Sequence, residues 1–423
     1  MAGLTALAPE LLDMIIGYLH PRHITSSLYN LCLTAKALRC IAQPRLFRIV
    51  APKSIPSFLQ IVLENPNLAE HIQSLNLFEC CEEEFCTAEG RCWRDRRELL
   101  SQRRHASLKM TELLVMKLPG LEEIALPSWL IDYGLLSSFL SKDTSGPTRN
   151  NRDILPALQA VAYSCSTLHS NEACDATDIL PLLGIRRIEK FCITQCMHIN
   201  MAGFDRLYLK EVEFIACAFT APQLQPFIAA CPDLVSFKYE AGSCLVKDYG
   251  GHEVKALELG QALIPVKDTL RCLHINLQYR GGDGFGTVRE NTDVDEEAID
   301  SLTVFSKLES LAICQYDLAA EEDIERWEDS DGLVIWEKQS KPWIHKLPKS
   351  LKKLTITDTY PSLYHELEKL LDIVSVSLPE LKLVQIYDID GTNLKPLFEQ
   401  AGIEFILTTR SRWKMYGDDS DSD

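Results

Sequence analysis

The sequence has no long hydrophobic run and no recognisable secretory signal. In 423 residues, no apolar stretch approaches the roughly 18–20 residues that a membrane-spanning helix requires. The amino-terminus lacks a basic region followed by an apolar stretch and a small-residue cleavage site. We therefore expect a cytoplasmic or nuclear protein, or one present in both compartments, with no membrane partner.

Positive charge is scarce relative to negative charge. The chain has 43 lysines and arginines against 60 aspartates and glutamates, a formal net charge of −17. Nonspecific binding of nucleic acid requires basic side chains that displace counterions from phosphates, so this composition disfavours a nucleic-acid partner. A basic partner would be attracted, although net charge affects the rate of encounter more than it identifies the partner.

The 15 cysteines follow no spacing typical of a metal site or a disulfide framework. Their number is odd and they are scattered, which predicts reduced thiols, most of them buried as small hydrophobic groups. Cys80, Cys81, Cys86, Cys92 and His105 are close in sequence, but they lack the paired Cys-x2-Cys spacing of structural zinc sites. We predict no bound metal, with zinc at this cluster as the less favoured alternative.

Patterns typical of catalysis are also missing from the sequence. The glycine-rich stretch 281–286 lacks the Gly-Lys-[Ser/Thr] ending of a phosphate-binding loop, and an acidic run follows it. There is no Gly-x-Ser-x-Gly or His-Glu-x-x-His motif, and the ten histidines show no local pairing that would single out one of them as a general base. We therefore predict a protein that is not an enzyme and needs no cofactor.

Residues 1–50 contain more apolar side chains than three short helices can bury. The first stripe follows the 3.6-residue period of one helical face and consists of Leu11, Leu12, Ile15, Ile16 and Leu19. Pro9 suits the first position of this helix. Pro44 is expected to end the third helix, because the residue before a proline disfavours the helical conformation. The segment therefore needs the rest of the chain, or another protein, to cover it.

The same residues resemble an F-box of the fungal type. The matching stretches are Leu7-x-Pro-Glu-Leu-Leu-x-x-Ile-Ile-x-Tyr-Leu, Leu31-Cys-Leu-Thr-Ala-Lys-Ala-Leu38-Arg39 and Ala42-Gln-Pro-x-Leu-Phe-Arg48. The chain departs from the family pattern where Ala8 follows Leu7 and where Leu38 replaces a common tryptophan. In that family the helices bind the Skp adaptor of cullin-based ubiquitin ligases, and the rest of the chain holds the substrate.

The resemblance implies an adaptor-binding face among the apolar side chains of this segment. The candidates are Leu7, Pro9, Leu11, Leu12, Ile15, Ile16, Leu19, Leu31, Leu33 and Leu38. Some of these residues must instead pack the three helices on one another. The alternative is that residues 1–50 only form a helical cap, which shields the first open face of a repeat array.

Beyond residue 65 the chain repeats the pattern Leu-x-x-Leu-x-Leu, with apolar substitutes. The copies begin at Ile72, Leu121, Leu158, Ile188, Leu209, Leu234, Leu270, Leu308, Leu351 and Leu381. Several copies follow a Leu-Pro-x-Leu entry such as Leu118-Pro-Gly-Leu, and a proline at this place ends a helix and favours extended backbone. Helix-like stretches lie between copies, at Ser54–Glu64, Gln223–Ala230, Glu296–Phe305 and Tyr364–Val376.

This order of elements predicts an α/β fold of the leucine-rich-repeat type, a curved parallel sheet with helices on its outer face. The copies are 21 to 49 residues apart, so the solenoid is irregular and carries insertions. We place the insertions near residues 141–151, 281–297 and 319–343. The alternative is a mixed α/β domain in which the strand motif recurs by chance.

Three regions are expected along the chain. Residues 1–50 form the F-box-like domain, residues 51–413 form the repeat solenoid, and residues 414–423 form a disordered acidic tail. Ser420 and Ser422 of this tail are surrounded by aspartates. They could be substrates of an acid-directed kinase, or they could simply be solvated.

Together these features predict a non-catalytic substrate receptor for cullin-based ubiquitination. Its F-box would bind a Skp-type adaptor and through it a cullin, and its repeats would hold a protein target close to the transferred ubiquitin. Trp327, Trp336 and Trp343 lie in an acidic insertion, and they could anchor a target with a basic segment or tuck the insertion against the core. The alternatives are a repeat scaffold with a helical cap and an enzyme built on the acidic or cysteine-rich clusters.

Overall fold

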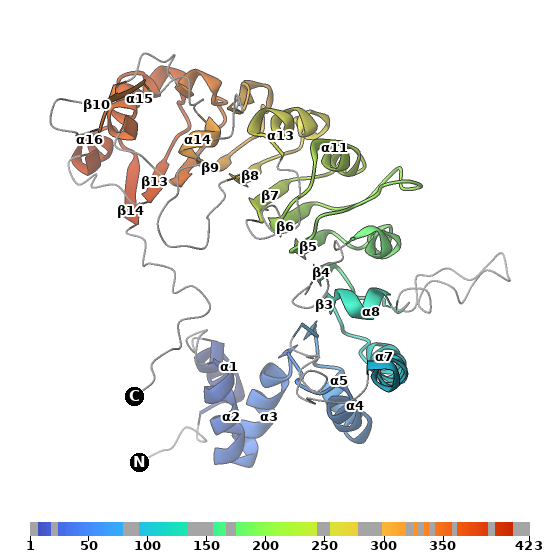
Figure 1. The fold of residues 1–423 in the computed structure, drawn as a ribbon. Coiled ribbons are helices and arrows are strands. Elements are labelled where there is room, and N and C mark those ends of the chain that lie inside the picture. Colours follow the sequence, from blue (N-terminus) through green and yellow to red (C-terminus); the bar gives the residue numbers. More distant parts are fainter. Residues whose placement is uncertain are drawn as a thin grey trace. The chain divides into compact units, whose positions relative to one another are not determined.

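The chain forms two compact units in the computed structural model (Figure 1). Unit 1 contains Met1–Ser166 and Asp178–Phe191, and unit 2 contains Thr167–Thr177 and Cys192–Asp423. The structure describes residues 7–17, 24–78, 93–132, 135, 155–165, 175–242, 254–277, 298–318, 325–328, 334–337, 343–357, 362–387 and 394–408. The predicted insertions at 141–151 and 281–297 and the predicted acidic tail at 414–423 lie outside these residues.

Unit 1 begins with three helices, α1 (Pro9–Gly17), α2 (Ile24–Thr34) and α3 (Lys36–Leu46). A small core between α2 and α3 contains Leu28, Cys32 and Ala42. Arg39 joins the two helices, because its Nε donates a hydrogen bond to the carbonyl oxygen of Cys32 at 3.0 Å. These helices therefore have a core of their own, but a small one.

Helix α3 does not end before Pro44, as the sequence predicted. Pro44 lies inside the helix, which continues to Leu46, and the N–H of Phe47 donates to the carbonyl oxygen of Gln43 at 3.0 Å. A proline in the last turn removes one hydrogen bond, and the fully buried Ala42 packs this part of α3 into the core shared with α2. Tertiary packing thus outweighs the local preference of the residue before proline.

The strands of unit 1 are parallel and follow the order of the chain. They are β1 (Ile49–Val50), β2 (Ser74–Asn76), β3 (Glu123–Pro127) and β4 (Ala160–Ser164). Strand β5 (Lys190–Thr194) begins in unit 1 and ends in unit 2. The connections contain α4 (Ile55–Glu64), α5 (Pro66–Ala69), α7 (Trp93–Met116), α8 (Ser128–Asp132), η5 (Thr177–Ile179) and α10 (Leu180–Leu183).

Helix α4 shows why these connections are helical. A proline occupies its first turn, where no backbone hydrogen bond is lost. Ile55, Phe58, Leu59 and Val62 are buried, and this spacing is that of one helical face. The helix predicted for Ser54–Glu64 is therefore present at Ile55–Glu64.

Unit 2 also contains parallel strands in chain order. They are β6 (Glu211–Cys217), β7 (Ser236–Ala241), β8 (Cys272–Asn276), β9 (Ser310–Cys314), β12 (Lys353–Thr357), β13 (Leu383–Tyr387) and β14 (Glu404–Thr408). A separate antiparallel pair consists of β10 (Glu325–Glu328) and β11 (Val334–Glu337). This pair belongs to the insertion predicted at 319–343.

Helices connect the parallel strands of unit 2. They are α11 (Ala221–Ala229), α13 (Ala256–Ala262), α14 (Gln315–Leu318), α15 (Ser362–Ser377) and α16 (Leu394–Gln400), with 3₁₀ turns η6 (Ile264–Val266), η7 (Leu302–Val304) and η9 (Trp343–Lys346). Helices α11, α13 and α15 lie on one side of the strands (Figure 1). The two helices predicted at 223–230 and 364–376 are confirmed with slightly different ends.

The helix predicted for Glu296–Phe305 is wrong over the described residues 298–305. Only the single turn η7 forms there. The hydroxyl of Ser301 accepts a hydrogen bond from the N–H of Thr303 at 3.4 Å, and the N–H of Ile299 donates to the carbonyl oxygen of Asp317 at 2.8 Å. These contacts satisfy backbone and side-chain groups outside a helix, which is how serine competes with helix formation.

The repeated apolar pattern coincides with a strand at every copy. The first apolar residue comes two positions before the strand, as Leu308 does before β9, and the second and third lie within or beside it. All three positions are buried in every copy, and Leu381 is the most exposed of them at 6%. Neighbouring copies are in register, since Leu273 pairs with Leu311 and Leu311 with Leu354. The prediction of a repeat-like α/β fold with parallel strands is therefore confirmed.

One hydrogen-bond pattern recurs at the start of successive strands. The carbonyl oxygen of Arg271 accepts from the N–H of Glu309 at 2.8 Å. The carbonyl oxygen of Glu309 in turn accepts from the N–H of Lys352 at 2.8 Å, and that of Lys352 from the N–H of Lys382 at 2.9 Å. These residues consequently stand next to one another in a row across the amino-terminal ends of β8, β9, β12 and β13.

Candidate binding surfaces

Large apolar side chains are exposed on the amino-terminal helices. On α1, Leu11 is 47% exposed and Ile15 is 45% exposed. Leu33 on α2 is 61% exposed, and Tyr29 is exposed as well. Because residues four apart lie on one face of a helix, Leu11 with Ile15, and Tyr29 with Leu33, form two exposed apolar pairs.

The residues predicted to bind an adaptor fall into two groups. Leu12 and Leu38 are buried, and Leu31 is half-buried, so these side chains hold the helices together instead of facing a partner. Exposed members are Leu7, Leu11, Ile15 and Leu33. Leu19 and the side chains of Pro9 and Ile16 lie outside the part of the chain that the structure describes.

Two exposed residues were missed by the sequence reasoning. Met14 and Tyr29 are each 56% exposed. Met14 follows Leu11 by three positions and Tyr29 precedes Leu33 by four, which are the spacings of one helical face. This spacing could have indicated that Met14 and Tyr29 share a face with the predicted residues. It does not distinguish exposed residues from those that pack helices together, because both have the same spacing.

The three tryptophans proposed for target binding do not form one described surface. Trp343, the first residue of η9, is only 2% exposed, so it packs inside unit 2 and cannot contact a target in this conformation. Trp336 pairs with Arg326 in the β10–β11 hairpin, beside Trp327. The side chains of Trp327 and Trp336 lie outside the described residues.

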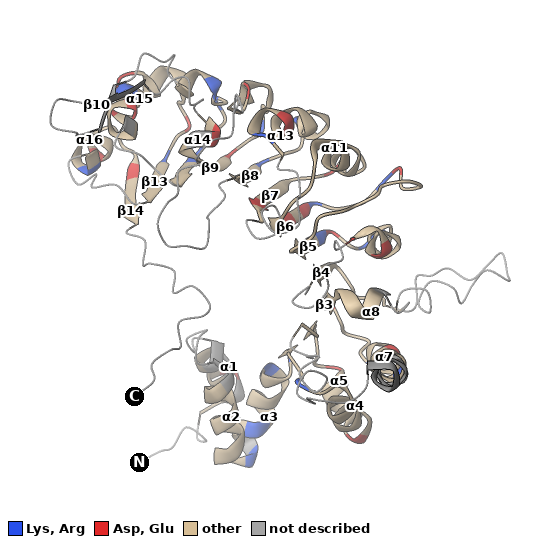
Figure 2. Cartoon of the chain, in the orientation of Figure 1, with Lys and Arg blue, Asp and Glu red and all other residues tan. Residues whose placement is uncertain are grey.

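Basic side chains lie at or just before the amino-terminal ends of β8, β12 and β13 in unit 2. We name Arg271, Lys349, Lys352, Lys353 and Lys382 the basic rim. Glu309 pairs with two of them, because its Oε1 lies 3.7 Å from Arg271 Nη1 and 3.2 Å from Lys352 Nζ. Figure 2 shows basic and acidic residues along these strands.

A polar cluster lies on the strand face of β7 and β8. Lys238 Nζ is 3.0 Å from Glu240 Oε1, and His274 Nε2 is 3.8 Å from the same oxygen. Burial lowers the pKa of His274, and Glu240 only partly opposes this effect. The imidazole is therefore neutral at pH 7 and can donate and accept hydrogen bonds.

Two described cysteines of unit 2, Cys196 and Cys272, have pKa shifts opposite to those of an activated thiolate. Cys272 is exposed and lies near His274, but burial and the nearby Glu309 raise its pKa. Burial also raises the pKa of Cys196 to about 12. A nucleophilic cysteine requires the opposite shift, so these thiols remain protonated at neutral pH.

The predicted zinc alternative falls largely outside the described residues. Cys80, Cys81, Cys86 and Cys92 are not among them, and His105 is exposed on α7. Within the described ranges, no cluster of three or more histidine, cysteine, aspartate or glutamate residues is arranged to hold a metal ion. None of the described helices is long and apolar enough to cross a membrane.

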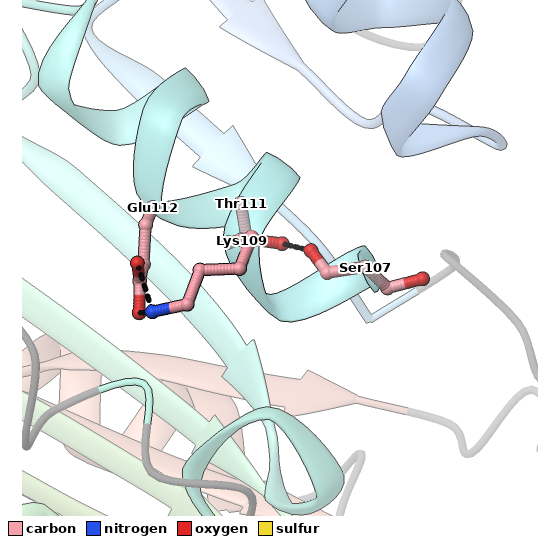
Figure 3. A network of polar contacts seen from close by, with 4 residues as sticks. All are labelled: Ser107, Lys109, Thr111 and Glu112. Carbon is pink, nitrogen blue, oxygen red and sulfur yellow. Dashed lines mark hydrogen bonds and ion pairs between the residues drawn. The ribbon is translucent and has the colours of Figure 1, made fainter. Parts of the chain in front are cut away.

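Polar contacts on α7 serve the helix itself. Lys109 Nζ lies 2.9 Å from Glu112 Oε2, and the hydroxyl of the buried Thr111 donates to the carbonyl oxygen of Ser107 at 2.8 Å (Figure 3). Both contacts join residues three or four apart, so they satisfy local groups. They do not build a binding site.

A pocket of about 440 Å³ lies in unit 2, between the segments that precede β9, β12 and β13. Its apolar lining includes Ile344, Leu347, Pro348 and Val376, and its polar lining includes Lys349 of the basic rim. None of the described residues that line it is acidic. This volume falls in the range of about 300–1,000 Å³ that is typical of ligand pockets.

Comparisons with known proteins leave the family open. No family model matches the chain, and no curated protein matches it. Among solved structures, a crystal structure of a Bacteroides fragilis protein is similar to 74% of this chain and 82% of its own, at 14% sequence identity and a TM-score of 0.33. A likeness at this level carries no argument about function.

Proposed function

We propose that the protein is a non-catalytic substrate receptor, which binds a Skp-type adaptor through α1–α3 and a protein target through its leucine-rich-repeat-like strands. The observation that carries the proposal is the exposed apolar face of α1 and α2, represented by Leu11, Ile15 and Leu33. The sequence resemblance of this segment to an F-box supports the choice of partner.

The energetic argument rests on the contrast between the exposed face and the small core of the helices. Among the side chains that the structure describes, the core cluster consists of α2 and α3 residues, whereas Leu11 and Ile15 remain about half exposed. Fully burying a side chain of this size contributes roughly 1.5–3 kcal/mol. Because Leu11 and Ile15 are already about half buried, a partner that covered them would gain roughly half of that value from each side chain. Neighbouring exposed apolar side chains commonly mark a protein-binding site.

A helical cap is the second candidate function of this segment. Helix α3 is followed almost directly by β1, and the carbonyl oxygen of Arg48 accepts hydrogen bonds from the N–H groups of Gln73 and Ser74 at 2.9 Å. This continuity favours a structural role at the first strand. The exposed apolar pairs of α1 and α2 favour adaptor binding. In a helix segment that served only as a cap, such residues would be packed against the repeat array and not exposed to solvent.

Co-purification with a Skp-type adaptor tests the proposal. We expect the wild-type chain to form a stoichiometric complex, and the double variant Leu11→Asp/Ile15→Asp to lose it. The matched control is Leu397→Asp/Ile264→Asp in unit 2, where the two side chains are 42% and 43% exposed. Absence of a complex with folded wild type, or equal loss in both double variants, would reject adaptor binding by this face.

Removal of residues 1–47 distinguishes the receptor from the capped scaffold. This deletion retains Arg48, whose carbonyl oxygen binds the start of β2. A receptor should remain soluble and cooperatively folded without its adaptor-binding segment. A capped array should expose its first apolar face and aggregate, which size-exclusion chromatography would detect.

A further inference from the structure

The amino-terminal ends of the strands differ in charge at equivalent positions. The two residues after the first apolar position are Glu122 and Glu123 in the copy at β3, but Lys352 and Lys353 in the copy at β12. The whole chain has a net charge of −17, so a locally basic edge runs against its composition. The acidic residues of the chain already provide the net charge that keeps a protein soluble, so solubility does not explain this basic edge.

Backbone hydrogen bonds fix the geometry of the basic rim. Arg271, Glu309, Lys352 and Lys382 immediately precede β8, β9, β12 and β13 and stand in one row. Adjacent strands are about 4.8 Å apart, so the row extends over about 14 Å, the length of four or five residues of extended peptide. The cations are therefore spaced for a short segment laid across the strand ends.

The positive charge of the rim exceeds the negative charge that could neutralise it. Glu309 is shared by Arg271 and Lys352. Within the described ranges, Lys349, Lys353 and Lys382 form no ion pair. Two further acidic residues lie on the same edge: Glu380 precedes β13, and Glu404 follows Lys382 in the row, its N–H donating to the carbonyl oxygen of Lys382 at 2.8 Å. With Glu309 they give three negative charges against the five positive charges of the basic rim, so an excess of cations remains.

The pocket adjoins this rim. Lys349 both lines the pocket and precedes Lys352 by three residues. A hydrogen bond from the Ser350 hydroxyl to the carbonyl oxygen of Leu308, at 2.9 Å, joins the segments before β12 and β9. Val376, which also lines the pocket, is 77% exposed. An apolar lining beside Lys349 suits a peptide that carries both acidic and apolar side chains.

We propose that the basic rim and the adjoining pocket bind an acidic segment of a partner protein, whose carboxylates face the lysines while one apolar side chain enters the pocket. Inorganic phosphate or nucleic acid would use the lysines but leave the apolar lining unoccupied. The proposal deepens the proposed function, because it names the class of target that the repeats would hold. It differs from the basic target that the net charge suggested.

The test is direct binding of a fluorescent glutamate-rich peptide with one central leucine to the full-length protein. We expect saturable binding that weakens as salt is added, because exposed charges are screened. The variant Lys353→Glu/Lys382→Glu should lose affinity at least about tenfold, without loss of an existing ion pair. Replacing the peptide's leucine by serine should also weaken binding.

The matched control is Lys255→Glu/Lys395→Glu, which makes the same change of charge in unit 2. Lys255 is the N-cap residue of α13 and Lys395 is in the first turn of α16, where glutamate is compatible with a helix N-terminus. The control also removes the pair of Lys395 with Glu399, whose atoms are 3.8 Å apart and whose side chains are both exposed, and such a pair contributes little to stability. The control should bind within about twofold of wild type. Equal losses in both variants, no peptide binding at low salt, or tighter binding of an oligothymidylate would each overturn the proposal.

Adaptor co-purification separates this inference from the proposed function. The rim variant should retain the adaptor, and Leu11→Asp/Ile15→Asp should retain the peptide. If wild type binds the peptide but no adaptor, the proposed receptor fails and the acidic-segment site stands. If wild type binds the adaptor but not the peptide, the reverse holds.

Discussion

The amino-terminal helices and the strands of unit 2 use the same apolar residue types for different purposes. In the strands, the repeated positions are buried throughout, as Leu273, Leu311 and Leu354 show. In α1 and α2, residues such as Ile15 and Leu33 stay exposed beside a small core. The difference teaches that hydrophobicity alone does not assign a residue to the core, because burial requires a neighbour that covers it.

The largest expected effect is in the unit 2 core. Phe214 is fully buried, and its ring centroid lies 5.0 Å from that of Phe219 and 5.3 Å from that of Phe227, both edge-on. Phe214→Ala should reduce the free energy of unfolding of unit 2 by about 3–5 kcal/mol, because it opens a cavity. Chemical denaturation would measure the change. A loss below about 1 kcal/mol would contradict the view that the apolar residues of the strands form a tightly packed core.

A smaller effect is expected in the helices. Leu28 is 2% exposed and belongs to their core cluster, so Leu28→Ala should destabilise them by about 2–3 kcal/mol. Hydrogen exchange of α2 and α3 amides would report this locally. Leu33→Ala, on the same helix but exposed, should cost less than about 0.5 kcal/mol. Equal effects of the two substitutions would show that Leu33 is covered within the protein.

The smallest expected effect is on the pH dependence of unit 2 stability, and it tests how far His274 on β8 is buried. Burial lowers the pKa of His274 in the folded state below its ordinary value of 6.5, so the folded state binds fewer protons than the unfolded state. Stability from this residue is therefore complete above about pH 6.5 and decreases as the pH falls through the folded-state pKa. His274→Gln should reduce the loss of unit 2 stability below pH 6.5, which denaturation at several pH values would measure. An unchanged pH dependence would place the cause elsewhere.

Parts of the fold could be predicted because their signals are local. The spacing of Leu308, Leu311 and Ile313 identifies strand β9 without any knowledge of its neighbours, because alternation within a strand sends these residues to one face. The spacing of Ile55, Phe58, Leu59 and Val62 identifies α4 in the same way. Where local signals competed with packing, as at Pro44, the sequence prediction was wrong.

The candidate sites were less predictable than the fold. Leu12 and Leu38 belong to the same apolar pattern as Leu11 and Ile15, and only the packing of the three helices separates the buried pair from the exposed pair. Trp343 was considered for target binding, yet it is buried. The basic rim joins residues more than a hundred positions apart, from Arg271 to Lys382, and no local pattern indicates such a row.

The sequence by itself determined the periodicity of the strands: where each copy of the repeated pattern forms a strand, and which side chains that strand buries. Those properties follow from backbone geometry and the hydrophobic effect within a few residues. Only the tertiary structure decided which apolar helix residues stay uncovered and which lysines become neighbours. These outcomes depend on contacts between distant segments, since hydrogen bonds between parallel strands set Lys352 beside Lys382 although thirty residues separate them in the chain.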